Sequence, residues 1–412
     1  MERAVEEDAG RLRDRVLTLL AAGGSLLLVA ALIFRAWTEE GGTNSYALVA
    51  ESLLTQTPWA SACFDGDCAL RDGLPYVVFP PFPGFLAIPL VLAGGTGQAG
   101  FVAISALLYA GSLLLWNGIF RHFGLDSACR AWALAAVGLA SPLYYVSLRG
   151  DGVWFFAQST AFFCLALALH QVLIRRNLVL AGVALGAAML SRQMSVFYLP
   201  LLFLIFLREE PLFRITPERL KAAASLCAAP AFALLLYFAY NHWRFGDPLD
   251  TGYDYIFAGG ETNSMLGKRV AEHGLWSAAY VPFNLFYTFL QGFHAEFADP
   301  ARLDLTGLDP AGSSLLAASP WLLLMFFAPA RRLTFAAVAM AASFTLMMLF
   351  YHSNGFSQYN TQRYALDWLP AALCVAGPLV TPERLPWVRL LVTWGILLNV
   401  ATVAVLGLTQ AS

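Results

Sequence analysis

Apolar residues gather along the chain in long runs separated by short polar stretches, the pattern of a protein with many membrane spans. A helix needs roughly 17 to 25 residues to cross the hydrocarbon core, or fewer where protein covers its ends, so the sequence predicts about eleven spans. The runs lie at residues 16–34, 99–120, 131–146, 153–173, 178–190, 194–207, 222–240, 314–329, 333–350, 365–380 and 390–408. Between the fifth and sixth runs, Ser191, Arg192 and Gln193 predict two short helices meeting at a polar corner.

Basic residues predict the orientation, because they collect on the cytoplasmic side of a membrane. With the N-terminus inside, most of the 25 Lys and Arg residues fall in or beside inner loops. The first run is followed by Arg35 and Trp37 rather than by a small-residue cleavage site, which is typical of a signal anchor. We therefore expect a single transmembrane domain over residues 1–412, with long outer segments at 35–98 and 241–312.

Composition supports this class of protein. The chain is 58% hydrophobic and 13% charged, whereas globular chains are about 45 to 50% apolar and about 25% charged. That argues strongly against a soluble enzyme. A net charge of -2 implies no nucleic-acid partner. The sequence has no Walker loop, no GxGxxG that opens a helix, no HExxH and no CxxC, so nucleotide-driven and zinc-hydrolase chemistry lack their residues.

The first outer segment is expected to hold interfacial helices. Helical spacing over 44–55 would place Asn44, Leu48, Glu51 and Thr55 on one face, and the apolar stretch 82–93 is too short to span. Between them, Pro80, Pro81 and Pro83 are expected to bar both helix and ladder pairing and to force a rigid corner. Asp72 and Tyr76 lie beside that corner and could form the wall of a site.

Carboxylates are frequent in this segment. A carboxylate just above the membrane could act as a general base, or as an oxygen ligand for a divalent cation that neutralises a phosphate. A solvated loop that is acidic by chance is the alternative. The six acids are Glu39, Glu40, Glu51, Asp65, Asp67 and Asp72. Glu51 differs from the others because its helix would hold it over the membrane surface near Asn44.

The same segment contains Cys63 and Cys68 in the run ACFDGDC. An oxidising outer compartment would allow a small disulfide loop, and a pair of metal-binding thiolates is the competing interpretation. Two sulfurs without a nearby His favour the disulfide.

Several basic and aromatic residues are candidates for binding. Arg149 and Asp151 could pair with each other or face a substrate. Arg192, between two apolar runs, needs a partner or water and could bind a lipid-linked phosphate. The aromatic and polar mixture that includes Arg244, Tyr253 and Asp254 suits a sugar, although aromatic residues also form the interfacial belt.

A further pair lies where the tenth run begins. Arg363 and Asp367 are four residues apart, so an α-helix would place them on one face, either as an intramembrane pair or as a phosphate-binding arginine oriented by its carboxylate. Tyr364 stands between them.

An ordered set of motifs extends over about residues 35 to 370. They read NSYALVAESLL, DGLPYVVFPPFPGFLAIPLVLAGG, LRGDGVWFFAQ, NHWRFGDPLDTGY, DPAGSSLLAASPWLLL and QYNTQRYALDWLP. In this order the motifs resemble the integral-membrane glycosyltransferases of the GT-C superfamily, most closely the bacterial branch related to protein O-mannosyltransferases and aminoarabinose transferases.

The resemblance implies an all-α polytopic protein of the bacterial inner membrane that transfers a sugar, with inversion, from a polyprenyl-phosphate donor to a lipid, glycan or protein acceptor on the outer face. A carboxylate of the first outer loop would deprotonate or orient the acceptor, and arginines would hold the donor phosphate. The sequence departs from the family at one place. An acid usually precedes the residues that match Tyr46 and Ala47, but here Gly41 to Asn44 carry none. Glu39, Glu40 and Glu51 are then the candidate bases, and a divalent cation is neither required nor excluded.

Two other functions fit many spans and buried arginines. A transporter or lipid flippase often shows inverted repeats and broken helices in matching halves, and no such pair is evident here. A non-catalytic subunit that binds polyprenyl phosphate is the second alternative, because of the missing acid.

Overall fold

The computed structural model describes residues 2–410, except 66, 259–264 and 300. Its contacts divide the chain into two compact units. The central unit comprises Arg35–Ile119 and Val146–Ala279, and the terminal unit comprises Met1–Phe34, Phe120–Tyr145 and Tyr280–Ser412. Helices dominate both units, so the chain is an all-α polytopic membrane protein, as predicted. The expectation of one transmembrane domain stays a prediction.

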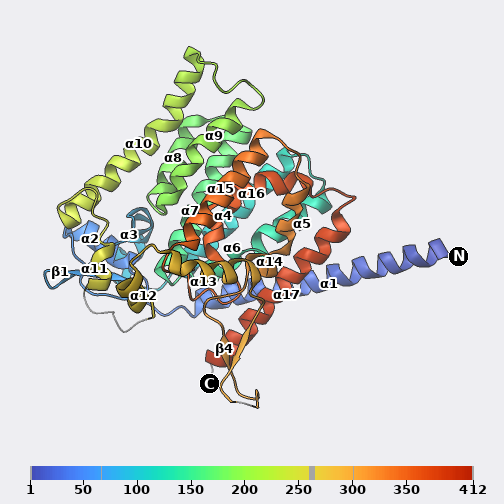
Figure 1. Cartoon of the computed structure of the whole chain (residues 1–412), viewed down its shortest axis with the longest axis horizontal. Helices are drawn as coiled ribbons and strands as arrows, with labels where there is room; N and C mark the ends of the chain where they lie inside the picture. The colour runs from blue at the N-terminus through green and yellow to red at the C-terminus, as the bar shows by residue number, and fades with distance from the viewer. Residues whose placement is uncertain (1, 66, 259–264, 300, 411–412) are drawn as a thin grey trace. The chain divides into compact units, whose positions relative to one another are not determined.

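The central unit contains the first outer segment and a group of apolar helices. Helix α8 packs against both α7 and α10 in this unit (Figure 1). Its elements are α2 (Tyr46–Thr55), β1 (Cys68–Arg71), β2 (Leu74–Val77), α3 (Phe82–Gly94), most of α4 (Phe101–His122), the end of α6 (Pro142–Leu148), α7 (Val153–His170), the π-helix η1 (Gln171–Arg175), α8 (Leu178–Met189), the 3-10 helix η2 (Gln193–Phe197), α9 (Tyr198–Leu207), α10 (Pro217–Phe245), α11 (Tyr253–Ala258), α12 (Met265–His273) and the 3-10 helix η4 (Ala278–Tyr280) up to its last residue.

The terminal unit is built from both ends of the chain. Helix α17 packs on α5 in this unit, and a short antiparallel hairpin joins β3 to β4 (Figure 1). Its elements are most of α1 (Glu2–Trp37), α5 (Ser127–Leu139), the start of α6, α13 (Val281–Leu285), the π-helix η5 (Phe286–Leu290), β3 (Ala295–Phe297), β4 (Leu305–Leu308), α14 (Leu315–Ala318), the 3-10 helix η6 (Pro320–Phe327), α15 (Arg332–Leu349), the 3-10 helix η7 (Arg363–Asp367), α16 (Leu369–Ala376), the 3-10 helix η8 (Gly377–Leu379) and α17 (Leu385–Gln410).

Every predicted apolar run is largely helical, but the runs differ in length. By length and composition, 6 helices of the described chain can cross a membrane, or up to 7 if α5 and α6, bent by 50°, count as one span. The runs at 178–190, 194–207, 314–329 and 365–380 form shorter helices. The predicted polar corner is present, because α8 ends at Met189 and η2 begins at Gln193. The predicted count of eleven spans is therefore not established by these helices.

The proline-rich corner differs in part from its prediction. Strands β1 and β2 form an antiparallel hairpin in which Leu70 lies opposite Pro75. Asp72 and Gly73 turn the chain with φ of 53° and 77°, the conformation of a two-residue hairpin loop. An edge strand tolerates Pro75, and Pro83 lies in the first turn of α3, where its missing N–H costs no helix bond. Of the three prolines in the prediction, Pro80 and Pro81 lie outside helix and strand, as expected, and only Pro83 enters a helix.

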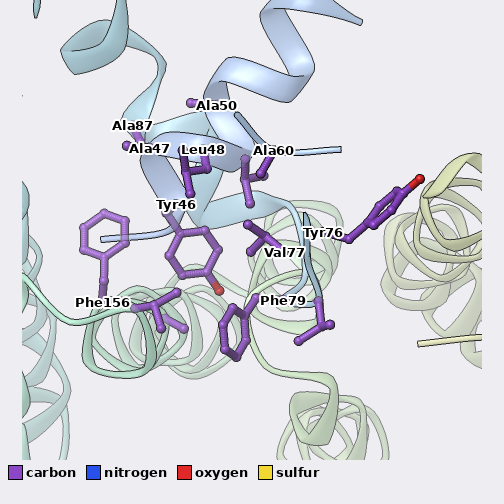
Figure 2. Packing of buried hydrophobic residues seen from close by; sticks show 14 of the residues in the cluster. Tyr46, Ala47, Leu48, Ala50, Ala60, Tyr76, Val77, Phe79, Ala87 and Phe156 are labelled. Carbon is purple, nitrogen blue, oxygen red and sulfur yellow. The ribbon is translucent and has the colours of Figure 1, made fainter. Parts of the chain in front are cut away.

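Helix α2 is more deeply placed than an interfacial helix with one wet face. All residues from Tyr46 to Ala50 are buried, whereas Thr55 at the end of the helix is exposed. Tyr46 packs between the rings of Phe79 and Phe156, at centroid distances of 6.1 Å and 5.9 Å (Figure 2). Asn44 lies before the helix rather than on its face. Of the predicted face over 44–55, Leu48, Glu51 and Thr55 lie in α2, whereas Asn44 lies outside it.

Candidate functional site

The start of α2 is the most densely bonded polar point of the first outer segment. Asn44 is buried, accepts a hydrogen bond from the Tyr46 N–H at 3.0 Å and donates to the Gly150 carbonyl at 3.0 Å. The next residue, Ser45, is fully buried and donates its hydroxyl proton to Asp65 Oδ2. The helix start is thus fixed by Asn44, and a carboxylate from outside α2 is bonded to Ser45.

A disulfide holds that carboxylate in place. Cys63 and Cys68 are bonded, with Cα atoms 5.9 Å apart, and Asp65 lies within the loop they close. Asp65 Oδ1 accepts a hydrogen bond from the Asp67 N–H at 3.1 Å, and Asp67 accepts one from the Trp154 indole. The loop is therefore tied at once to the hairpin, to α7 and to the start of α2.

Asp65 is half-buried and has no Lys, Arg or His within ion-pair distance among the residues that the structure describes. Burial raises the pKa of Asp65 above its ordinary 3.8, while hydrogen bonds from Ser45 and Asp67 act in the opposite direction. Taking a carboxylate out of water without a counter-cation favours its protonated form. Burial therefore gives Asp65 a higher proton affinity than an exposed aspartate.

The three sequence candidates for the base have different surroundings. Both oxygens of Glu39 accept backbone hydrogen bonds at the start of α4, from Gly100, Phe101 and Val102 at 2.9 to 3.1 Å. Burial raises the pKa of Glu39 despite these bonds. Glu40 is exposed, and Glu51 is half-buried on α2 and accepts a hydrogen bond from the Ser61 hydroxyl. Glu39 therefore caps a helix, and Glu51 is the better placed of the other two.

Asp151 was predicted either to pair with Arg149 or to face a substrate. Its carboxylate lies 2.6 Å from Arg35 Nη2 and 3.7 Å from Arg149 Nε, and it is buried. Two guanidinium groups thus neutralise one carboxylate where α1 ends and α7 begins. The geometry favours the structural interpretation for Arg149 and Asp151.

Arg192 and Tyr253 lie in the same unit as Tyr46, and both affect its pKa. The Tyr46 hydroxyl is fully buried and has no hydrogen-bond partner among the described residues. Burial raises the pKa of Tyr46 well above its usual range, and among the nearby groups Tyr253 and Asp65 add to this effect while the charge of Arg192 opposes it. We call Ser45, Tyr46, Asp65, Arg192 and Tyr253 the Tyr46 cluster.

Arg244 is a buried cation at the end of α10. Its Nη1 donates to the Val77 carbonyl and its Nη2 to Asn241 Oδ1 at 2.7 Å, and the guanidinium lies 4.0 Å from the Tyr240 ring centroid. Its Nε has no hydrogen-bond partner, and no carboxylate of the described residues is within ion-pair distance. A buried cation held only by neutral groups is expensive and can neutralise an incoming anion.

The other candidates of the central unit lie outside this cluster. Tyr76 is buried and packs on the Phe245 ring at 5.4 Å, so it is a core residue. Asp72 is exposed at the hairpin turn, with Arg71 Nε at 3.7 Å, and Asp254 is exposed on α11. None of these three shows a contact that would form the wall of a site.

Arg363, Tyr364 and Asp367 lie in the terminal unit, in η7. Arg363 is buried, donates from Nε to the Gly355 carbonyl at 2.7 Å and lies 4.9 Å from the Tyr364 ring centroid. In a 3-10 helix residues three apart eclipse. The expectation that Arg363 and Asp367 share an α-helical face was therefore wrong.

Before η7 the chain forms a buried polar loop, residues 351–362, which we call the amide loop. Gln358 is fully buried and donates to the carbonyls of Ala311 and Asn354 at 2.8 and 3.0 Å. Gln362 donates in the same way to Tyr287 and Ser313. Phe356, Ser357 and Tyr359 have positive φ in this loop, a conformation that costs energy and persists only where the surroundings fix it.

No group of three or more His, Cys, Asp or Glu that could hold a metal ion occurs in the described part of the chain. The need for a divalent cation therefore stays open. Sequence reasoning missed the position of Asp65, which it counted only among six acids. The available signal was its place between two cysteines in ACFDGDC.

No family model matches the chain, and no curated protein matches it. Two solved structures with similar folds are ArnT from Cupriavidus metallidurans bound to undecaprenyl phosphate and an Archaeoglobus fulgidus oligosaccharyltransferase in complex with Zn and sulfate. The first is 15% identical with a TM-score of 0.48 over 87% of this chain and 59% of that chain; the second is 14% identical with a TM-score of 0.49 over 95% and 52%.

Both are GT-C glycosyltransferases, the class that the sequence resembles. This chain spans only 59% and 52% of their lengths. At such low identity the likeness concerns the fold alone and assigns no substrate or residue role to this chain.

Proposed function

We propose that the protein is a membrane glycosyltransferase that moves a sugar from a polyprenyl-phosphate donor to a lipid, glycan or protein acceptor at the extracytoplasmic surface. The observation that carries the proposal is the Tyr46 cluster. There the half-buried carboxylate of Asp65 accepts a hydrogen bond from buried Ser45 and has no counter-cation among the described residues, one residue before a buried hydroxyl without a partner. A carboxylate and an unsatisfied hydroxyl at the start of one helix suit a reaction in which an acceptor loses a proton.

The donor phosphate is bound by arginine. Arg192 stands where α8 ends and η2 begins, half-buried beside apolar helices. A guanidinium can bind two phosphate oxygens at once, which fixes orientation as well as charge. Arg244 adds a second positive charge that no described carboxylate cancels. Tyr253 and the exposed Asp254 begin α11 and suit the sugar hydroxyls.

The reaction is a single displacement with inversion. An acceptor oxygen attacks the anomeric carbon, the bond from that carbon to the phosphate oxygen breaks, and polyprenyl phosphate leaves as the anion. A carboxylate of the first outer segment deprotonates or orients the acceptor. Of the three sequence candidates, Glu51 is kept for this role, because Glu39 caps α4 and Glu40 is exposed. Positioning and charge complementarity supply most of the rate enhancement.

Binding of undecaprenyl phosphate alone tests the donor side without knowledge of the sugar. We expect the full-length protein in nanodiscs to bind it, and Arg192→Ala to weaken binding by roughly 10- to 100-fold, as the loss of a charged hydrogen bond implies. Arg121→Ala, at the exposed end of α4, is the matched control. Equal binding by both variants would remove Arg192 from the donor site.

Transfer is then assayed with radiolabelled hexose and pentose polyprenyl phosphates in proteoliposomes that contain a bacterial membrane extract as acceptor. Label in an acid-stable product supports a transferase. Binding without any turnover across the donor panel would contradict the transferase proposal and identify a lipid-binding subunit.

A further inference from the structure

The loop closed by Cys63 and Cys68 is more constrained than a surface loop needs to be. Cys68 begins β1 and lies opposite Val77, the disulfide ties it to Cys63, and Asp67 accepts the Trp154 indole proton at the start of α7. Asp65, within this loop, accepts the Ser45 hydroxyl proton at the start of α2. All these constraints position one carboxylate.

The carboxylate so positioned is unlike its neighbours. Asp151 is neutralised by Arg35 and Arg149, and Glu39 is bonded by three backbone N–H groups. Asp65 is half-buried, and within the described residues it has hydrogen bonds but no cation. A protein gains little stability by holding a carboxylate in this way, since desolvation of an unpaired charge opposes folding.

A second observation marks the same place as a ligand site. The Tyr46 hydroxyl, one residue after Ser45, is fully buried and has no hydrogen-bond partner in the described chain. Buried hydroxyls are nearly always bonded. This orphan hydroxyl belongs to the residue after Ser45, whose own hydroxyl bonds Asp65, so the start of α2 holds both a carboxylate without a cation and a polar group that a substrate can bond.

Given the proposed transferase function, on which this inference rests, we infer that Asp65 is the catalytic base and that the Cys63–Cys68 disulfide positions it. Asp65 takes the proton of the acceptor hydroxyl while that oxygen forms its bond to the anomeric carbon. The bond to phosphate breaks with its electron pair on the leaving phosphate oxygen, and Asp65 later releases the proton to water. Glu51, bonded to Ser61 more than a turn further along α2, orients the acceptor.

The test compares Asp65→Asn with Glu51→Gln in the full-length protein. Loss of a general base lowers turnover by roughly 100- to 10,000-fold. We expect that loss in kcat for Asp65→Asn, with KM for the donor and binding of undecaprenyl phosphate unchanged. Glu51→Gln is expected to raise the acceptor KM while keeping most of kcat. Asp247→Asn, exposed in the second outer segment, is the control for an Asp to Asn change and keeps wild-type rates.

The disulfide gives an independent measurement on folded wild-type protein. Reduction with dithiothreitol is expected to lower kcat about tenfold, as misplacement of a catalytic group does, and to leave undecaprenyl phosphate binding unchanged. The Cys63→Ser, Cys68→Ser double variant should start at the reduced rate and be insensitive to dithiothreitol.

The outcomes separate the two proposals. Active wild-type protein with Asp65→Asn within twofold of it, or with no response to dithiothreitol, overturns the assignment of Asp65 and leaves the transferase intact. If Asp65→Asn does not fold, the dithiothreitol response of the wild type decides alone. Donor binding without transfer by the wild type overturns both.

Discussion

The Tyr46 cluster and the amide loop both contain buried polar groups, but they differ in how far those groups find partners within the protein. In the amide loop, neutral side chains such as Gln358 and Gln362 donate to backbone carbonyls that a loop conformation leaves free. In the Tyr46 cluster, Asp65 has hydrogen bonds but no counter-cation, and the Tyr46 hydroxyl has none at all among the described residues. The amide loop is therefore stabilised by its own hydrogen bonds. The Tyr46 cluster keeps a carboxylate and a hydroxyl that a ligand can bind.

This difference implies that substitutions in the two regions should fail differently. Removing an amide leaves buried backbone groups unsatisfied, so stability falls. Removing a charge from the Tyr46 cluster removes a desolvation cost together with its hydrogen bonds, so stability changes little while binding or turnover falls. The three predictions below test this distinction, beginning with the largest effect.

Gln358→Ala is expected to lower the free energy of unfolding by roughly 2 to 5 kcal/mol, because it leaves the Asn354 carbonyl and the Arg363 N–H without their amide partner. The apparent Tm in detergent measures this. Gln193→Ala is the control, since Gln193 is exposed and bonds one tyrosine hydroxyl. Equal Tm values for the two variants would show that the amide loop is not a stabilising element.

The sequence predicted the helices but not the amide loop. The hydropathy of consecutive residues is enough to locate a helix, so the apolar stretches and the polar corner at Arg192 could be predicted directly. The partners of the amide loop come from far along the chain: Gln358 bonds Ala311, and Asn360 bonds Asn399. No local pattern carries such pairings.

The candidate site was predicted in part for a related reason. The cysteine spacing indicated the disulfide that the structure contains, whereas the roles of the other candidate residues stay predictions. Sequence spacing could not show which of the carboxylates would be buried. Glu39 and Glu51 are close to Tyr46 in sequence, whereas Asp65 reaches Ser45 only because the disulfide loop folds back onto α2. The Asp-Gly pair at 72–73 is a hairpin signal that the proline run obscured.

Arg244→Met tests whether a buried arginine contributes to anion binding or to stability. The change removes two hydrogen bonds, to Val77 and Asn241, but also the cost of a buried charge. We expect stability to fall by roughly 1 to 3 kcal/mol at most, because the acceptors left unsatisfied are partly offset by the removal of a buried charge. Binding of undecaprenyl phosphate should weaken about tenfold, the equivalent of about 1.4 kcal/mol.

Arg244→Lys keeps the charge and is the control for it; it should retain more of the binding than the Met variant. The opposite result, a large fall in Tm with unchanged binding, would place Arg244 with the structural groups beside Gln358.

Glu39→Gln should have the smallest effect, and it separates helix capping from catalysis within the same outer segment. Burial raises the pKa of Glu39 above its ordinary 4.5, against the backbone bonds from Val102, Phe101 and Gly100, and the charge of Asp151 adds to the rise. A raised pKa means that the folded state binds the proton more tightly. The stability that Glu39 contributes is therefore fully present below about pH 4.5 and is lost as the pH rises through the folded-state pKa.

Glutamine cannot titrate, so the Tm difference between wild type and Glu39→Gln should move against the wild type as the pH rises from 4 to 8. The corresponding change in the free energy of unfolding should be about 1 kcal/mol or less, in the range of helix-terminus charge effects. Transfer activity should stay near the wild-type rate, since both Glu39 oxygens are already bonded to the backbone of α4. A Tm difference that moves toward the wild type would mean that the helix N-terminus stabilises the carboxylate more than burial opposes it. Glu39 would then be a carboxylate that the N–H groups of α4 stabilise as an anion.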